Sequence, residues 1–171
     1  CVLFGDGAAG VLIERTEDNT GILAEDIGSD GTKAMALTGG FSPAANSFYT
    51  TNAAAERSLY MDGRAVFDFA TRQAPKSVKR LVEKAGCSLE ELDFVLPHQA
   101  NSRIVEVISR KLKIPMDKFY MNMDEYGNTS SASIPIALNE MFEKGLIKTG
   151  SVGVLTGFGA GFTWGSMLIR F

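Results

Sequence analysis

Helical and extended apolar patterns alternate along this sequence, and that alternation restricts its fold more than any other feature. From Asp62 to about Ala85, apolar residues recur every four positions, which predicts a long helix with one buried face. The repeating residues are Val66, Ala70, Ala74, Val78 and Val82. Pro75 lies inside this pattern and removes one backbone donor from the helix.

Two further helices are predicted at 102–113 and 134–144, and the second has Pro135 in its first turn and Gly145 beyond its end. Short, mainly apolar runs at 93–96 and 152–156 predict buried strands. Because strands and helices alternate, the class is α/β, with a mostly buried sheet covered by helices.

The remaining segments carry weaker signals. A capping box at 88–91 predicts the start of a short helical turn. The stretch 31–60 has no clear period and is expected to be a long irregular loop, which is usually functional or mobile. Further strands are predicted within 1–14 (two, around a turn at Gly5-Asp6-Gly7) and at 22–27, 119–122 and 162–171.

Composition excludes several classes of protein. The chain has 171 residues, enough for one domain, and 17 Lys+Arg against 20 Asp+Glu, so nucleic acid is not expected as a partner. No run of about 18 apolar residues is present, so no membrane span is expected. Two cysteines are too few for a disulfide framework and favour a reducing cytoplasm.

Both ends of the chain fall inside strand-like runs. The sequence starts without Met in Cys1-Val2-Leu3-Phe4 and ends in Ser166–Phe171. We therefore expect residues 1–171 to be one domain of a longer chain, with part of an active site supplied from elsewhere.

The only histidine, His98, directly follows the predicted strand at 93–96, at the edge where α/β sheets commonly bind ligands. A single histidine in this place is more often structural than catalytic. Pro97 restricts the backbone before it, and Gln99 and Asn101 add uncharged polar groups. A neutral imidazole in this setting can donate one hydrogen bond to a carbonyl oxygen while a neighbour holds its other nitrogen.

Two other polar segments are candidates for the same site. Tyr126–Ser133 holds Asn128 and more hydroxyl groups than one helix cap needs, so Ser131 or Ser133 can cap the helix while Asn128 points elsewhere. The glycine-rich turn at 157–161 is either a tight hairpin or a set of backbone N–H groups that forms an oxyanion hole. No phosphate-loop pattern, metal-ligand spacing or Cys-x-x-Cys is present, so no metal site is expected.

Taken in order, these segments resemble a known family. Pro97–Asn101, Tyr126–Ser130 and Gly157–Gly165 together resemble the C-terminal half of 3-oxoacyl-[acyl-carrier-protein] synthase III, a thiolase-like enzyme. Further matches in the family's order are Phe4-Gly5-Asp6-Gly7, Gly28-Ser29-Asp30-Gly31 and Met61-Asp62-Gly63-Arg64. The resemblance implies a thiolase-like α/β half with a mixed five-stranded sheet covered by helices.

The resemblance also implies an acyltransferase. The family condenses an acyl-CoA, commonly acetyl-CoA, with malonyl-acyl-carrier-protein (malonyl-ACP) in a decarboxylative Claisen reaction that initiates type II fatty acid synthesis. His98 and Asn128 match its catalytic histidine and asparagine, and the backbone N–H of Ala160 matches its oxyanion position. No cofactor beyond the substrates is implied.

Partners follow from the same resemblance: acyl carrier protein (ACP), a CoA thioester, the N-terminal half of the same chain and a second copy in a homodimer. The residues that match the carrier-docking surface are Gln99, Ala100, Asn101, Ser102, Arg103, Arg110 and Lys111, with Lys113 beside them. Positions near CoA or pantetheine are Arg64, Ala100 and Asn101. A solvated helix face is the alternative interpretation of the basic residues.

Three departures from the family pattern stand out. The nucleophilic cysteine belongs to the N-terminal half, and neither Cys1 nor Cys87 lies in its context. Ala160 replaces the usual glycine and would be strained if that position needs a positive φ. Asp68 stands where some members carry a basic residue, which weakens the docking surface.

Two other functions remain open. One is a related ketoacyl synthase of secondary metabolism, which a panel of acyl-CoA primers would separate from the first. The other is a non-catalytic module that binds carrier protein or mediates dimerisation.

Overall fold

The computed structural model describes residues 3–39 and 59–171. Its main sheet has four strands in the order β1-β6-β5-β4, with bounds Gly21–Ser29, Thr163–Arg170, Val152–Gly159 and Phe94–Pro97 respectively. β1 is antiparallel to β6, β6 is antiparallel to β5, and β5 is parallel to β4, so the sheet is mixed. A second sheet pairs only β2 (Leu37–Thr38) with β3 (Tyr60–Met61).

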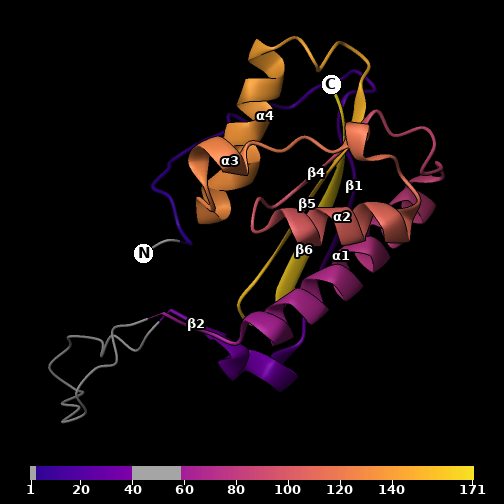
Figure 1. The fold of residues 1–171 in the computed structure, drawn as a ribbon. Helices are drawn as coiled ribbons and strands as arrows, with labels where there is room; N and C mark the ends of the chain where they lie inside the picture. The colour runs from indigo at the N-terminus through magenta and orange to yellow at the C-terminus, as the bar shows by residue number, and fades with distance from the viewer. Residues whose placement is uncertain (1–2, 40–58) are drawn as a thin grey trace, which may run out of the picture.

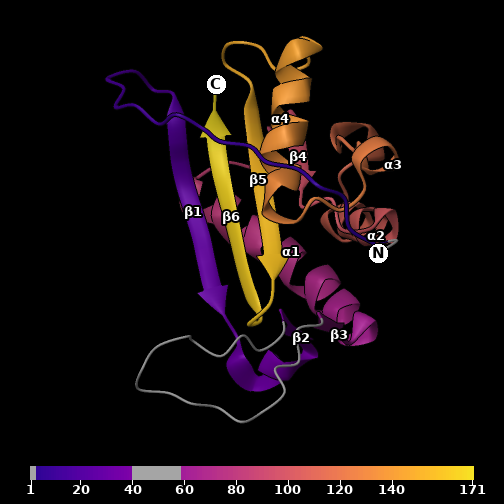
Figure 2. The ribbon, with the colours of Figure 1, turned by 90° about the vertical axis from the view of Figure 1, so that its left-hand side faces the viewer.

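Helices cover both faces of the main sheet (Figures 1 and 2). On one face lie α1 (Gly63–Ala85) and α2 (Ser102–Leu112), and on the other lies α4 (Ser133–Glu143). The shorter helices are α3 (Met123–Tyr126) and the 3-10 turns η1 (Gly31–Ala36), η2 (Met116–Lys118) and η3 (Ser130–Ala132). No helix of the described residues is long and apolar enough to cross a membrane.

β4 shows how the sequence produces this layering. All of its four residues are buried, as the apolar run predicts for a strand covered on both faces. Because side chains alternate along a strand, Val95 packs with α1 and α2, whereas Phe94 and Leu96 pack with α4. The strand therefore joins two apolar clusters and ends, after Pro97, directly at His98.

The predicted helices are confirmed. Asp62 caps α1 by accepting the Ala65 N–H at 3.0 Å, and Gly86 ends it in the left-handed region with φ of 68°. The strands at 22–27, 93–96, 152–156 and 162–171 are also confirmed within a residue or a few of their predicted bounds. β5 extends to Gly159, so the expected glycine turn at 157–161 is reduced to its last residues.

Other expectations about the secondary structure are wrong. The main sheet has four strands among the described residues, not five. Phe4 forms only an isolated bridge to Asn128, and Phe119 only one to Val95. No strand forms at 11–13, because a strand needs a second strand to pair with its backbone and no described segment lies beside these residues as one. Their apolar side chains are exposed.

The capping box at 88–91 and the loop expected at 31–60 can also be compared with the structure. The Ser88 N–H donates to Glu91 Oε2 at 2.6 Å, so the bond from the capping box is present, but only a turn follows it. Of the loop expected at 31–60, the described parts form η1, β2 and β3, and 40–58 lies outside the described residues.

Candidate active site

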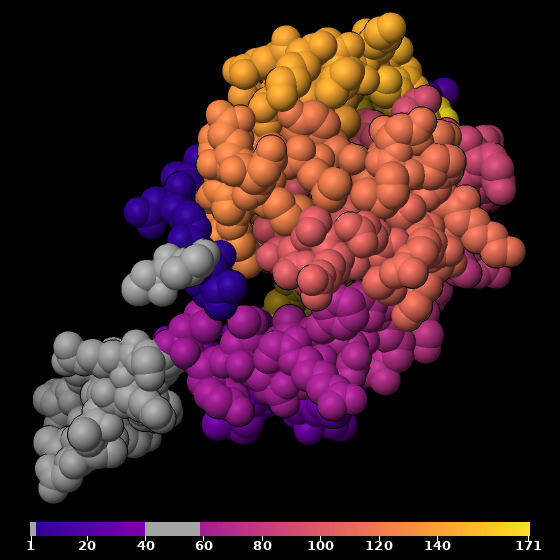
Figure 3. Space-filling view, in the orientation of Figure 1, coloured from indigo at the N-terminus to yellow at the C-terminus, as the bar shows by residue number. Residues whose placement is uncertain are grey.

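A cleft of about 400 Å³ lies where β4 and β5 end. Since these two strands are parallel, the segments that follow them emerge at the same edge of the sheet. The space-filling view shows the hollow between the starts of α1 and α2, with the N-terminal segment beside it (Figure 3). His98, Asn128 and Ala160 all line this cleft, although they come from three separate segments.

His98 is held on several sides. Its backbone N–H donates to the Thr156 carbonyl at 2.8 Å, which ties the end of β4 to β5. Its ring Nδ1 lies 2.7 Å from the Ser133 hydroxyl, and Phe158 packs against the ring edge-on with centroids 5.4 Å apart. Burial lowers the pKa of His98 to about 4, so the imidazole is neutral at pH 7.

Asn128 is held through its amide oxygen. Oδ1 accepts the Ser130 N–H at 2.9 Å, and Ser130 adopts a left-handed conformation with φ of 54°. The Asn128 carbonyl accepts the Gly5 N–H at 3.0 Å, and a Cβ on Gly5 would overlap the Tyr126 carbonyl. With the oxygen occupied, the Asn128 Nδ2 group keeps its donors for a ligand, since no described residue accepts from it.

Ala160 lies in the turn between β5 and β6. Its carbonyl accepts the Thr163 hydroxyl at 2.9 Å. The next part of the turn is anchored by reciprocal backbone bonds of 2.7 Å between Phe162 and Asp30, and the Phe162 ring stacks on Phe69 at 4.3 Å. Ala160 has no positive φ, so the strain considered for alanine at this position does not arise.

The structure separates the other predicted site residues. Ala100 and Asn101 line the cleft, and Asn101 also caps α2 by accepting the Arg103 N–H at 2.9 Å. Arg64 is exposed in the first turn of α1, directly after Gly63, which lines the cleft. The exposed residues of α2 are Ser102, Arg103, Glu106, Arg110 and Lys111, with Lys113 directly after it.

Gln99 requires a correction, because it lies in the interior with 1% of its surface exposed. Its Nε2 donates to the carbonyls of Pro97 and Tyr120 at 2.8 and 3.2 Å, and its Oε1 accepts the Asn122 N–H at 3.3 Å. A side chain enclosed in this way cannot contact a docked protein. Gln99 instead joins the end of β4 to the segment before α3.

The expectation that Ser131 or Ser133 caps the helix at 134–144 is also wrong. Neither caps α4, whose N-cap residue is Ala132 with no side-chain cap bond. Ser133 contacts His98 instead, and Phe158 packs on the same ring; neither was singled out from the sequence as part of the site. The surplus of hydroxyl residues after Gly127 was the one available signal for Ser133.

Cys87 does not line the cleft. It is half-buried, and burial raises the pKa of its thiol. Cys1 lies outside the described residues. Within 3–39 and 59–171, no group of His, Cys, Asp or Glu could hold a metal ion.

Comparison with known proteins identifies the family. Residues 82–171 match the family model described as 3-Oxoacyl-[acyl-carrier-protein (ACP)] synthase III C terminal. The chain belongs to the 3-oxoacyl-[acyl-carrier-protein] synthase III family. Residues 1–31 match a second model of the same synthase. The chain has the thiolase-like α/β fold of the C-terminal half of this family.

Curated relatives and solved structures support the same family assignment. The β-ketoacyl-[acyl-carrier-protein] synthase III of Clostridium acetobutylicum is 46% identical over 99% of this chain and 52% of its own length. That of Streptococcus uberis is 48% identical with the same coverage. The crystal structure of the Aquifex aeolicus synthase III has a TM-score of 0.87 and 40% identity, over all of this chain and 51% of its own. The chain thus spans about half the length of the curated relatives it matches.

Proposed function

We propose that this chain forms the half of a β-ketoacyl-ACP synthase III that decarboxylates malonyl-ACP and presents the resulting nucleophile to an acyl group. The observation that carries the proposal is the convergence of His98, Asn128 and the Ala160 backbone on one cleft. The acyl group comes from an acyl-CoA, acetyl-CoA in the simplest case, and is held by a cysteine outside this chain.

The chemistry requires fixed donors at one oxygen. When the carbon–carbon bond to the malonyl carboxylate breaks, CO₂ leaves and the electron pair moves onto the thioester as an enolate. His98 and Asn128 donate hydrogen bonds to that oxygen as its charge develops. The neutral state of His98 supports this role, because a neutral imidazole donates without itself losing a proton to the enolate.

The second step is acyl transfer. The enolate carbon attacks the acyl thioester, forms the new carbon–carbon bond and releases the cysteine thiolate. The tetrahedral intermediate carries a negative oxygen, for which the Ala160 N–H is the proposed donor. Anchoring of this turn by Asp30 and Phe69 supports the role, since a preorganised donor needs no rearrangement during the reaction.

Replacing the imidazole tests the proposal. In the protein that carries this chain, His98→Ala is expected to lower malonyl-ACP decarboxylation by about 100- to 1000-fold, as for loss of one oxyanion donor. Transfer of labelled acetyl from acetyl-CoA to the enzyme should persist. The matched control is Asn139→Ala on α4, an exposed side chain that lies outside the cleft and, among the described residues, bonds only Glu143. A His98→Ala enzyme that decarboxylates at the normal rate would contradict the assignment.

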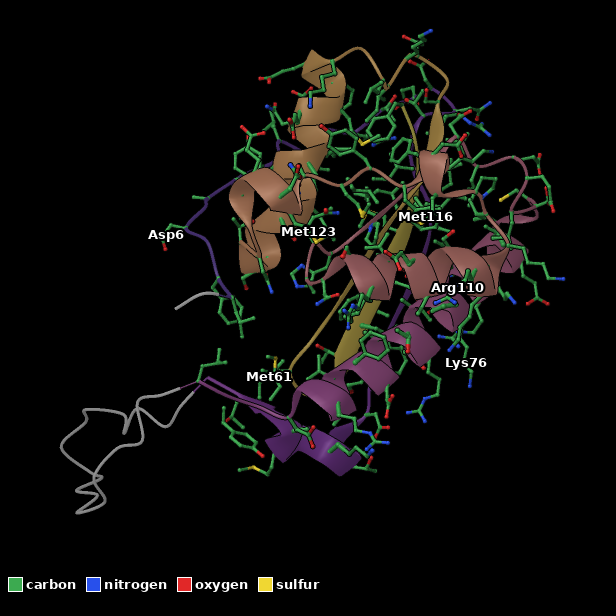
Figure 4. The ribbon with its side chains drawn as sticks, in the orientation of Figure 1. Asp6, Met61, Lys76, Arg110, Met116 and Met123 are labelled. Carbon is green, nitrogen blue, oxygen red and sulfur yellow. The ribbon has the colours of Figure 1, made fainter. Side chains whose placement is uncertain are left out.

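We further propose that α2 receives the carrier protein. Arg103 and Arg110 are exposed on this helix, with the exposed Glu106 between them, and Lys76 is exposed on α1; Figure 4 labels Arg110 and Lys76 on the two helices. Such a surface suits an acidic partner and a phosphopantetheine phosphate. Asp68 is exposed on α1 and opposes this charge.

Charge reversal tests the docking surface. Arg103→Glu with Arg110→Glu should raise KM for malonyl-ACP by about tenfold or more at low salt and leave KM for acetyl-CoA unchanged. Lys148→Glu is the control, because Lys148 is exposed in the loop between α4 and β5. Equal effects of the two changes would argue against docking on α2.

The proposal also includes a cytoplasmic homodimer in which each subunit adds a nucleophile-bearing half. Its support is the exposed apolar set Val11, Leu12, Ile13 and Ile27, whose exposed fractions are 67, 87, 74 and 77%. The 171-residue chain expressed alone should aggregate in size-exclusion chromatography. A stable monomer would count against these partners.

A further inference from the structure

The Ser133 hydroxyl forms a buried contact with His98 that the proposed chemistry leaves unexplained. Oγ lies 2.7 Å from Nδ1 of the ring, and Ser133 is 2% exposed. Ser133 is the first residue of α4, whereas His98 follows β4, so the contact joins the two sides of the site. Which of the two atoms supplies the proton decides the tautomer of the imidazole.

The surroundings of Ser133 determine the direction of this hydrogen bond. Its Oγ already accepts the Gln99 backbone N–H at 3.2 Å. Among the described residues, Nδ1 of His98 is the only acceptor that an Oγ–H of Ser133 reaches. If Nδ1 carried the proton instead, the buried hydroxyl hydrogen would have no partner and no access to water, which is unfavourable.

We propose that Ser133 is a positioning residue that holds His98 in the tautomer with its proton on Nε2, so that the cleft receives a hydrogen-bond donor. The chain of bonds runs from the Gln99 N–H to Ser133 Oγ and from Ser133 O–H to Nδ1. Phe158 packs on the ring edge and opposes rotation of the imidazole out of this arrangement. The burial that keeps the ring neutral also makes the choice of tautomer consequential, because only one nitrogen is protonated.

The tautomer of His98 follows from the hydrogen bonds of Ser133 alone. The inference rests on the proposed function only in assigning the Nε2–H to the enolate oxygen. Free imidazole exchanges between two tautomers, whereas the enolate oxygen needs a proton on the nitrogen that faces the cleft. Loss of Ser133 would leave Nδ1 with no fixed donor and let the other tautomer compete. One buried hydrogen bond of this kind corresponds to about a tenfold effect on the population and on kcat.

Nitrogen-15 NMR of the imidazole in the protein that carries this chain tests the inference directly. The His98 signals are identified by their loss in His98→Gln. In the unmodified protein at pH 7, Nδ1 is expected to give the shift of an unprotonated nitrogen and Nε2 that of a protonated one. The reverse pattern would overturn the inference even if decarboxylation depends on His98, and the expected pattern would stand even if it does not.

Variants then test the role of the hydroxyl. Ser133→Ala is expected to mix the two tautomers and to lower kcat for decarboxylation about tenfold with little change in KM for malonyl-ACP. Ser133→Thr, which keeps the hydroxyl, should retain the original spectrum. Ser131→Ala is the matched control, since Ser131 is exposed two residues earlier in the same segment. An unchanged tautomer and kcat in Ser133→Ala would overturn the role of Ser133.

Discussion

Lys111 allows a test that distinguishes a structural role of this side chain from a role in docking the carrier protein. Its Nζ donates to the backbone carbonyl of Thr71 on α1 at 2.9 Å. In a regular helix that carbonyl accepts the N–H four residues later, but the residue there is Pro75, which has none. Lys111 therefore supplies the donor that the proline removes and links α2 to α1. We predict that Lys111→Met destabilises the protein through this carbonyl.

The magnitude follows from the burial of the acceptor. Thr71 is 5% exposed, so water replaces the lost ammonium poorly. A hydrogen bond to a charged group contributes about 1.5–3 kcal/mol, and exposure of the lysine side chain reduces this to about 1–2 kcal/mol here. Pro75→Ala restores an N–H that the Thr71 carbonyl can accept. In that background, Lys111→Met should lower the free energy of unfolding by no more than about 0.5 kcal/mol.

Urea unfolding of the four proteins of this double-mutant cycle measures the coupling, with circular dichroism as the signal and equal m-values as the check. Lys76→Met is the control, because Lys76 is exposed on α1 and should shift stability by at most about 0.5 kcal/mol. KM for malonyl-ACP, measured in parallel, reports any separate docking role. If Lys111→Met costs the same with Pro75 and with alanine, the compensation argument is refuted.

Two more predictions concern packing and charge. Asp26 has a pKa of about 2 instead of 3.8, chiefly because Arg80 donates to its carboxylate, so its contribution is complete above pH 3.8 and is lost as the pH falls toward 2. The stability advantage over Asp26→Asn in urea unfolding should therefore shrink by up to about 2 kcal/mol between pH 5 and pH 2, and a constant difference would contradict this. Gly153→Ala should lower the free energy of unfolding by about 1–3 kcal/mol, measured by thermal unfolding, because a Cβ at this position overlaps the Phe94 ring. Gly31→Ala is the control, since a Cβ there meets open space. Equal changes in the two variants would refute the packing argument.

The Asp26 network also shows why α1 has a fixed place on the sheet. Asp26 of β1 accepts Arg80 and Ser77 of α1 and the Trp164 indole of β6. Ser77 then contacts Ser166 at 2.8 Å, which contacts Thr156 at 2.8 Å, the residue whose carbonyl holds the His98 backbone. A polar chain thus crosses the layer from the outer edge of the sheet to the site.

The helices and the buried strand could be predicted from the sequence because their information is local. A helix satisfies its own backbone within four residues, so the four-residue spacing of Val66 to Val82 and the cap at Asp62 suffice to define α1. The motifs around His98, Asn128 and Ala160 are also short segments that can be recognised in the sequence, and the structure brings all three residues to one cleft.

What required the tertiary structure is the partner of each polar group. The sequence predicts two strands within 1–14 around a turn at 5–7, yet a strand needs a neighbour in space, and of the described residues 3–14 only Phe4 forms a bridge, to Asn128. The family resemblance places Gln99 and Lys111 on the docking surface, and the local sequence predicts Ser133 as a possible helix cap. Their partners lie across the fold, on the segment before α3, on α1 and at the end of β4, because a polar side chain bonds to whatever packing places beside it.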